Sequence, residues 1–337
     1  MTSLRSESKG LDPDLMAGDV RKYLVLALKV AVSAATLWLV LRSLSYETVV
    51  RLLSGVAPAW LVVALFSFLF AQLFSALRFL FISRALGCPV TFRQSLGVHF
   101  IGLWFNQVLP TSLGGDVVKI ALLRQLMNLS LAFRVTILDR AAGFIFLLVS
   151  IVLLLPFYSS VLPSAASVWG LGTSAAGALA VIAALSAMGR HLIRMTARIP
   201  LLTPVMAVFA DMWRFRRGRP LLEQAWTSAI VHVNGIVSFA LIGQALHVDA
   251  ALFDYFLIVP LVFLIALLPI SFAGWGIREI GAVWLFGLIN IDAEHAASMS
   301  VLYGLMLVVA GTPGLAVLWS GSLVGADRYR EPAKTAE

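Results

Sequence analysis

The stretch LPTSLGGDVVK occupies residues 109–119, and the related stretch LPISFAGWGIRE occupies residues 268–279. Both interrupt long apolar runs with proline, serine and glycine. Both also place a cation nine residues after the proline: Lys119 follows Pro110, and Arg278 follows Pro269. In a membrane protein, hydrophobic segments broken by Gly and Pro at corresponding places in two halves of the chain indicate a substrate site.

The composition of the 337-residue chain supports a membrane location. Hydrophobic residues make up 60% of it, charged residues only 12%, and its mean hydropathy is +0.94. A soluble domain has about 25% charged residues, and several runs here reach the roughly 20 apolar residues that a helix needs to cross a bilayer. The composition therefore predicts an all-α polytopic membrane protein.

The charge and the cysteine count exclude other classes. The formal net charge is +8, and in a membrane protein such an excess of Lys and Arg belongs on the cytoplasmic face, so we expect no nucleic acid partner. The single cysteine, Cys88, cannot form an intramolecular disulfide, and no Cys/His cluster indicates a metal. Phosphate-loop, dinucleotide and HExxH motifs are absent from the sequence, so we expect no cofactor.

The hydropathy pattern divides the chain into one membrane domain and two tails. Residues 1–21 are predicted to be a disordered cytoplasmic tail, residues 22–325 a single transmembrane domain, and residues 326–337 a second cytoplasmic tail. Two apolar blocks, 95–123 and 252–290, contain the broken stretches. The expected spans are 23–44, 58–82, 136–157, 166–188, 221–246 and 296–322.

The loop charges orient these segments. Loop 189–220 carries seven arginines against one acid, Asp211, and is predicted to be cytoplasmic; within it, 201–215 is expected to be a helix in the membrane interface. Arginines flank block 95–123 on both sides, whereas only acids flank block 252–290. We therefore expect both termini in the cytoplasm and two opposed re-entrant helical hairpins in a cell (inner) membrane.

The spacing of the two stretches predicts an inverted-topology repeat. Adding their offset of 159 residues to span 58–82 gives 217–241, and adding it to 136–157 gives 295–316, which match two later spans. Span 23–44 shifts to 182–203 and overlaps 166–188 only in part. The predicted repeats cover about 22–157 and 166–322, with opposite orientation.

The two breaks predict a central site. Irregular backbone is tolerated in a bilayer only where protein buries it or where it lines a wet cavity. Each break leads into a half-helix whose N-terminus attracts anions, with Thr111 or Ser112 and Ser271 as expected N-caps and the cations expected on the second turn. The candidate substrate-binding residues are Asn106, Pro110, Ser112, Gly114, Gly115, Asp116, Lys119, Arg140, Ser271, Gly274, Gly276, Arg278 and Glu279.

Structural roles remain open for several of these groups. Asp116 and Glu279 can bind a cationic head group, or they can pair with Lys119 and Arg278 and only hold the hairpins together. The Asp139–Arg140 pair is a candidate for the site or for an interfacial anchor. Three other polar residues within the apolar helices are assigned to packing or snorkelling: Arg78, His99 and His232.

The pattern Asn106-Gln107-Val108-Leu109-Pro110, followed by Gly114-Gly115-Asp116 and Lys119, resembles the flippase-like family of the lysylphosphatidylglycerol synthase transmembrane region. Asp139-Arg140 and the second broken stretch also fit, and the resemblance covers about residues 20–325. Lys119 and Asp139 depart from it, since Arg and Glu are expected there. A lysine lacks the bidentate phosphate contact of an arginine.

This resemblance implies a fold with re-entrant helices and the movement of a lipid with a charged head group between leaflets. Stand-alone relatives, such as the hopanoid-biosynthesis-associated membrane protein, have the membrane part alone. In two-domain members a soluble aminoacyl-transfer domain follows. The present sequence ends at Glu337 without one, so we expect no synthesis of lysylphosphatidylglycerol by this chain itself.

Three functions are compatible with these observations. The leading hypothesis is a translocase for a polar or phosphate-bearing lipid, in which Lys119 and Arg278 hold the anion. The second is a membrane-embedded transferase acting on a lipid carrier, with Asp116 or Glu279 as base. The third is an accessory subunit that docks on an envelope-biosynthesis enzyme through loop 189–220. The expected partners are a membrane lipid, with a lipid-synthesising enzyme and a second copy of the chain left open.

Overall fold

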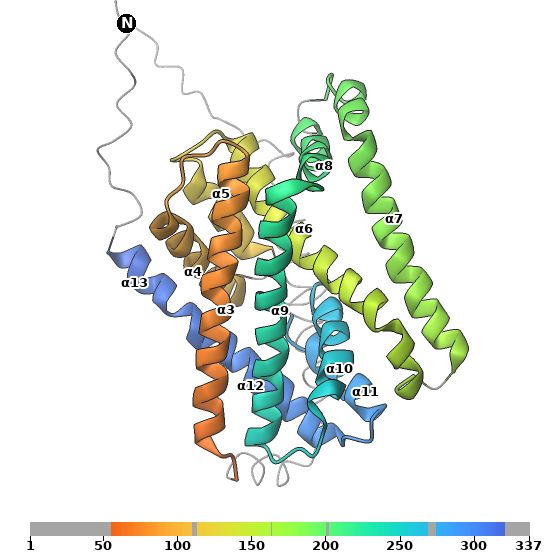
Figure 1. The fold of residues 1–337 in the computed structure, drawn as a ribbon. Coiled ribbons are helices and arrows are strands. Elements are labelled where there is room, and N and C mark those ends of the chain that lie inside the picture. Colours follow the sequence, from red (N-terminus) through yellow and green to blue (C-terminus); the bar gives the residue numbers. More distant parts are fainter. Residues whose placement is uncertain (1–54, 110–112, 163, 200–201, 269–273, 321–337) are drawn as a thin grey trace, which may run out of the picture.

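The computed structural model describes residues 55–109, 113–162, 164–199, 202–268 and 274–320. Within these ranges the ordered elements are helices and there is no strand (Figure 1). They are α3 (Pro58–Ala85), α4 (Phe92–Val108), α5 (Gly114–Leu123), α6 (Leu129–Leu154), the 3-10 helix η1 (Leu155–Ser160), α7 (Ala165–Met195), α8 (Thr203–Phe215), α9 (Gly218–Ala245), α10 (Leu252–Ala266), α11 (Ile277–Gly287), α12 (Ala293–Gly311) and α13 (Pro313–Trp319).

Five helical segments are long and apolar enough to cross a membrane, by length and composition. They correspond to five of the six predicted spans, and the sixth, 23–44, lies outside the described residues. The prediction of several membrane-length helices is therefore confirmed. The five segments are Pro58–Ala85, Leu129–Ser160, Ala165–Met195, Gly218–Ala245 and Ala293–Trp319.

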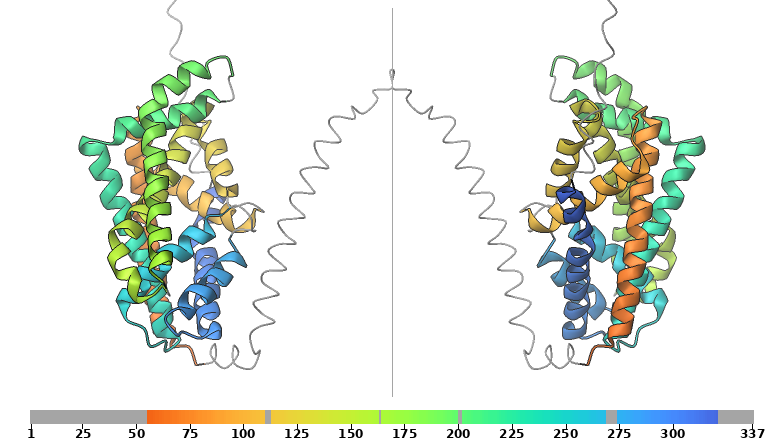
Figure 2. Two further views of the ribbon diagram at one scale, coloured as in Figure 1. Left: turned by 90° about the vertical axis from the view of Figure 1, so that its right-hand side faces the viewer. Right: turned by 90° about the vertical axis from the view of Figure 1, so that its left-hand side faces the viewer.

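The two long helices α3 and α9 run antiparallel, side by side, along one face of the bundle (Figures 1 and 2). At one end the backbone N–H of Ala57, just before α3, donates to the carbonyl of Ala245 at the end of α9, at 3.0 Å. Further along, the Ser67 hydroxyl donates to Asn234 Oδ1 at 3.1 Å. Hydrogen bonds between polar side chains stabilise helix pairs in an apolar environment.

Each broken block forms a pair of short helices. Helices α4 and α5 pack against each other on either side of the first break, and α10 and α11 do so around the second. The helix lengths then recur along the chain: α3 to α6 have 28, 17, 10 and 26 residues, and α9 to α12 have 28, 15, 11 and 19. The two short pairs lie toward opposite ends of the molecule (Figures 1 and 2). The inverted repeat itself stays a prediction.

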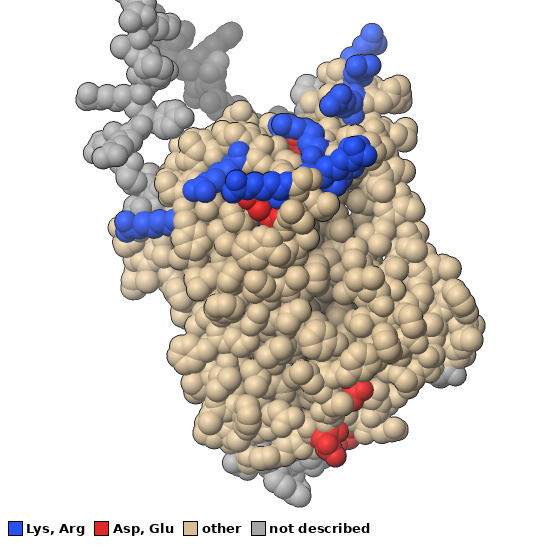
Figure 3. Space-filling view, in the orientation of Figure 1, with Lys and Arg blue, Asp and Glu red and all other residues tan. Residues whose placement is uncertain are grey.

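Charges are segregated between the two ends of the molecule. Lys and Arg gather at the end that holds α8, with a few acidic residues among them, whereas the opposite end shows acidic residues and no Lys or Arg (Figure 3). At the acidic end, the described connections 55–57, 246–251 and 288–292 contain no Lys or Arg. This is the distribution predicted for a cytoplasmic and an external face. The exposed basic residues are Arg84, Arg93, Arg124, Arg190, Arg194, Arg198, Arg214, Arg216, Arg217 and Arg219.

The helix predicted at 201–215 is present as α8, which packs on α6 and α7. Arg134 Nε of α6 lies 2.7 Å from Asp211 Oδ2 of α8. Gly189 of α7 lies so close to α8 that a Cβ there would strike the backbone of Ala210. The single acid of the basic loop thus attaches α8 to the bundle, while the placement of α8 in the membrane interface stays a prediction.

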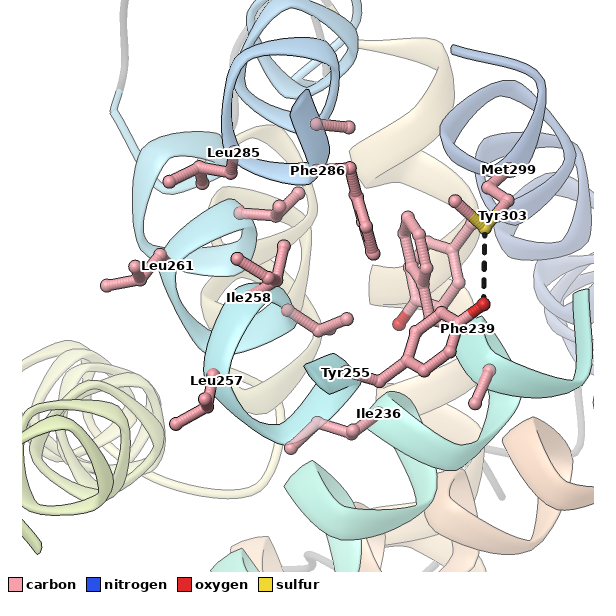
Figure 4. Close-up of a cluster of buried hydrophobic side chains, with 14 of the residues drawn as sticks. Ile236, Phe239, Tyr255, Leu257, Ile258, Leu261, Leu285, Phe286, Met299 and Tyr303 are labelled. Carbon is pink, nitrogen blue, oxygen red and sulfur yellow. Dashed lines mark hydrogen bonds between the residues drawn. The ribbon is translucent and has the colours of Figure 1, made fainter. Parts of the chain in front are cut away.

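A buried cluster of apolar side chains joins α9, α10, α11 and α12 (Figure 4). The rings of Phe239 and Phe286 stack with centroids 5.6 Å apart, and the Tyr255 hydroxyl donates to Met299 Sδ at 3.8 Å. Gly243 of α9 leaves the room that the Tyr255 hydroxyl occupies. This cluster fixes α11, and with it the turn that precedes α11, against the rest of the bundle.

Cys88, in the connection between α3 and α4, reports on a second buried cluster, to which α3, α4, α5, α6 and α8 contribute. It is 3% exposed, and burial raises the pKa of its thiol, an effect that nearby Arg134 opposes. Because the thiolate is the reactive form, we expect maleimide labelling of the native protein to be slower by about two orders of magnitude than in denaturing detergent. Labelling at the same rate in both conditions would contradict the packing around this turn.

Candidate functional site

A cavity of about 360 Å³ lies in the middle of the helix bundle. Its volume falls within the roughly 300–1,000 Å³ of known ligand pockets. Both halves of the chain contribute to its wall, and the lining combines polar and apolar side chains. The polar lining residues are Gln72, Ser75, Arg78, His99, Asn106, Asp116, Lys119, Asp139, Arg140, His232, Arg278 and Tyr303.

Lys119 of α5 is a buried cation in this wall, with 6% of its surface exposed. Gly102 of α4 lies so close that a Cβ there would overlap the aliphatic chain of the lysine. The Nζ atom lies 6.0 Å from the ring centre of Phe79. Within the described ranges, Lys119 makes no ion pair with a carboxylate. An anion entering the cavity would supply the missing partner.

Asp116 lies one turn before Lys119 but pairs with a different cation. Its Oδ2 is 2.7 Å from Arg140 Nε of α6, which ties the short helix α5 to a membrane-length helix. The Asp116–Lys119 pair, one of the alternatives that the sequence left open, is therefore not formed. In a buried site the crossing of two helices decides which cation reaches a carboxylate.

A glycine turn, Gly274-Trp275-Gly276, leads into α11. Gly274 and Gly276 have φ of +81° and +85°, a region that residues with a Cβ rarely adopt. The Gly276 N–H donates to Glu279 Oε2 at 2.6 Å. Gly276, and not Ser271, is therefore the N-cap of α11, and the predicted cap is wrong.

Arg278 and Glu279 form a buried pair, which is one of the two alternatives that the sequence left open for Glu279. Arg278 Nη2 lies 2.7 Å from Glu279 Oε1, and the Ser300 hydroxyl donates to the same oxygen at 3.0 Å. The guanidinium also lies 5.0 Å from the Trp275 ring centre. Arg278 lines the cavity, whereas Glu279 is 0% exposed and lies outside the lining set.

The two cations sit on different turns of their helices, contrary to the expectation of a shared second turn. Lys119 is in the second turn of α5, because α5 begins at Gly114, soon after Pro110. Arg278 is in the first turn of α11, because α11 begins only at Ile277. The glycine turn 274–276 lies between the second break and the start of α11, so α11 begins later relative to its break than α5 does. Equal spacing in sequence therefore does not give equal positions on the helices.

Polar residues of α3, α4 and α9 complete the wall. Arg78 Nε lies 2.8 Å from Asp139 Oδ1, and its Nη1 donates to Ser228 at 3.1 Å. His99 Nε2 is 2.9 Å from Gln72 Oε1, and the buried His99 Nδ1 has no hydrogen-bond partner in the part of the chain that the structure describes.

The sequence assigned Arg78, His99 and His232 to packing or snorkelling and did not predict that they line the cavity. Arg78 and His99 are in fact bonded to other helices, so packing describes part of what they do. His232 stacks on Phe146 with ring centroids 5.1 Å apart, and all three side chains also face the cavity. An arginine within an apolar span was the sequence signal for a site.

The predicted site residues fall into three groups. Asn106, Asp116, Lys119, Arg140 and Arg278 line the cavity. Gly114, Gly115, Gly274, Gly276 and Glu279 are buried beside it and shape the helix ends, and Asn106 Oδ1 accepts the Gly115 N–H at 2.8 Å. Pro110, Ser112 and Ser271 lie outside the described residues.

Gly115 tests the close approach of α4 and α5. A Cβ at this position would overlap the carbonyl oxygen of Gly102, and a backbone atom cannot move aside as a side chain can. We expect Gly115→Ala to destabilise the fold by about 1–3 kcal/mol, measured as the shift in Tm in detergent. Gly177→Ala is the control, because nothing lies within 4 Å of a Cβ there. A Tm for Gly115→Ala as high as that of the control would contradict the close contact.

The comparisons with known proteins agree with this architecture. The family model described as the lysylphosphatidylglycerol synthase TM region matches residues 26–314 of the 337. A search of the curated proteins found no match. The family match spans the cavity-lining residues of both halves. The chain therefore belongs to the family of the lysylphosphatidylglycerol synthase transmembrane region, whose members are related to lipid handling in membranes.

Proposed function

We propose that this protein binds a lipid with a phosphate-bearing head group and moves that head group between the two leaflets of a cell (inner) membrane. The observation that carries the proposal is the central cavity, where buried Lys119 lacks a carboxylate partner among the described residues and Arg140 and Arg278 lie in the same wall.

The electrostatics of the cavity favour an anion. Four cations line it, Arg78, Lys119, Arg140 and Arg278, against the two acids Asp116 and Asp139. A charge held inside a membrane protein without a partner costs several kcal/mol. A phosphate in the cavity offsets this cost through charge-assisted hydrogen bonds. The N–H groups at the start of α5 and α11 add partial positive charge.

The arrangement of the helices supports movement as well as binding. The recurring order of long, short, short and long helices fits the proposed inverted repeat, and the two short pairs fit re-entrant hairpins from opposite faces. The basic end fits a cytoplasmic face and the acidic end an external face. In this proposal a head group reaches the cavity from either side as the halves rock, while its tails stay in the bilayer.

Reconstitution into liposomes tests the proposal. Vesicles of phosphatidylcholine containing head-group-labelled phosphatidylglycerol would be treated with a membrane-impermeant quencher, and the loss of the protected inner-leaflet signal would be followed. We expect movement only when the protein is present, and slower movement with Lys119→Ala. Arg84→Ala, which removes an exposed arginine at the basic end, should move the lipid at the wild-type rate.

Two outcomes would count against this function. Movement that is equal in protein-free vesicles, or equal with Lys119→Ala, would remove the cavity from the mechanism. Binding without movement, together with a covalent change of the head group seen by mass spectrometry, would instead support the transferase hypothesis.

A further inference from the structure

A second cavity, of about 580 Å³, lies between α6, α7 and α10. Its lining is apolar, and Arg140 and Ser174 are the polar residues among those that line it. We define this groove by Ile137, Leu148, Ile151, Leu171, Ala178 and Leu264. The head-group site proposed above does not account for it.

Small side chains on α7 create the groove. Ser174, Ala175 and Ala178 of α7 face Leu148 and Ile151 of α6 across it. Few residues of α7 are buried, namely Gly172, Ala175, Ser186 and Gly189. The middle of α7 therefore stands off from α6 and α10, because its short side chains do not fill the space between the helices.

The groove and the central cavity share a wall. Arg140, Phe144 and Leu267 line both of them. Arg140 is at this junction with 27% of its side chain exposed. One side of the junction is therefore rich in charge and the other side is apolar. This polarity matches a molecule that has a phosphate at one end and a hydrocarbon chain at the other.

We propose that the groove between α6, α7 and α10 holds an acyl chain of the lipid whose head group occupies the central cavity, with Arg140 at the phosphate between them. This inference rests on the proposed function. It narrows the substrate to a phospholipid whose acyl chain and head group are both recognised by the protein. A guanidinium is a frequent phosphate partner. A chain leaving the phosphate at Arg140 would enter the groove directly.

The bilayer environment determines what the groove contributes. Lipid tails are as apolar as leucine side chains, so a chain gains little hydrophobic free energy on leaving the bilayer for the groove. The groove contributes through its shape instead. Close contacts hold the acyl chain in a position from which the head group enters the cavity. A bulky side chain in the groove should therefore displace long-chain lipids while sparing a head group that has no long tail.

Photo-crosslinking of the wild-type protein is the first test. Phosphatidylcholine nanodiscs would carry phosphatidylglycerol with a diazirine near the middle of one acyl chain, and the labelled residues would be mapped by mass spectrometry. We expect labelling to concentrate on groove residues of α6 and α7, between 137 and 151 and between 171 and 178. Labelling spread evenly over outward-facing residues, or absent from the groove because residues 1–54 or a partner cover it, would overturn the inference.

A substitution that fills the groove with a large side chain is the second test. Ala178 lines the groove, whereas Ala176 on the same helix is exposed and does not. We expect Ala178→Trp to bind dioleoyl phosphatidylglycerol about tenfold more weakly than wild type, and Ala176→Trp to bind it equally well. Both variants should bind dibutyryl phosphatidylglycerol, whose short chains leave the groove empty, as wild type does.

The outcomes distinguish a failure of the groove proposal from a failure of the proposed function. Wild-type affinity of Ala178→Trp for the dioleoyl lipid would overturn the groove and leave the head-group site standing. Failure of the wild-type protein to bind either lipid would overturn the proposed function itself. If Ala178→Trp loses both lipids through misfolding, the crosslinking pattern of the wild-type protein decides, since it requires no substitution.

Discussion

Arg278→Ala is expected to destabilise the protein by about 3–5 kcal/mol, because it leaves a buried carboxylate without its partner. Glu279 is 0% exposed and lies 2.7 Å from the guanidinium of Arg278. After the substitution, the Ser300 hydroxyl and the Gly276 N–H are its remaining contacts among those described here. The readout is the rate at which Cys88, buried in the native fold, becomes accessible to maleimide during thermal unfolding in detergent.

A second substitution should separate the buried charge from the lost side chain. When Glu279→Gln is added to Arg278→Ala, the charge disappears but the shape remains, so the double variant should recover part of the stability. The interaction energy of a double-mutant cycle measures this coupling. A double variant whose destabilisation equals the sum of the two single ones would show that the pair makes no coupled contribution, and would contradict this account of Glu279.

Lys119→Met is expected to have the opposite pattern. Lys119 is buried without a carboxylate partner in the described ranges, so an apolar side chain of similar length should keep or raise the Tm. Binding of a phosphate-bearing lipid should weaken by about 10- to 100-fold, as expected for the loss of one charge-assisted hydrogen bond. Equilibrium binding of phosphatidylglycerol in nanodiscs, together with the Tm, provides the two measurements.

The matched control for this prediction is Lys119→Arg, which keeps the positive charge. Lys119 lines the cavity, so the larger guanidinium can extend into it. We expect Lys119→Arg to retain most of the binding. Binding by Lys119→Met that equals that of wild type would remove Lys119 from the head-group site, whatever the Tm shows.

Together the two predictions assign different roles to Lys119 and Arg278, although each follows the proline of its break by nine residues. Arg278 is held by Glu279 and Ser300 behind the glycine turn, so its main expected contribution is to the integrity of α11 and of the cavity wall. Lys119 is buried and makes no ion pair with a carboxylate in the described part of the chain. It is therefore the residue whose loss should affect binding most and folding least.

Local patterns predicted much of the fold correctly. Hydropathy located the five described membrane-length helices to within a few residues, apart from the earlier start of α6 and the later end of α7. It could do so because the free energy of placing a helix in a bilayer depends on its own composition. The broken stretches marked where the short pairs α4–α5 and α10–α11 divide. The basic loop and the acidic loops predicted which ends of the helices would lie together, and the surface charges show this segregation.

The site was predicted only in part. Asn106, Asp116, Lys119, Arg140 and Arg278 line one cavity, and their role in binding a substrate stays a prediction. Four of them could be selected from the sequence because charges within apolar segments are costly enough to indicate a site. Their pairings were not all predictable. Asp116 pairs with Arg140 of α6 and not with Lys119 of its own helix. The N-cap of α5 is Leu113 in place of the predicted Thr111 or Ser112, and that of α11 is Gly276 in place of Ser271.

The sequence by itself determined that the chain is helical, that it spans a membrane several times, which end of the helices is basic, and where two of the apolar segments break. These properties depend on neighbouring residues or on single helices. Only the tertiary structure decided that Arg78, His99 and His232 face the same cavity as Lys119, and that an apolar groove opens from it at Arg140. Arg78 bonds to Asp139 and to Ser228, which are 61 and 150 residues away. Such contacts depend on how helices cross, and no local pattern records that geometry.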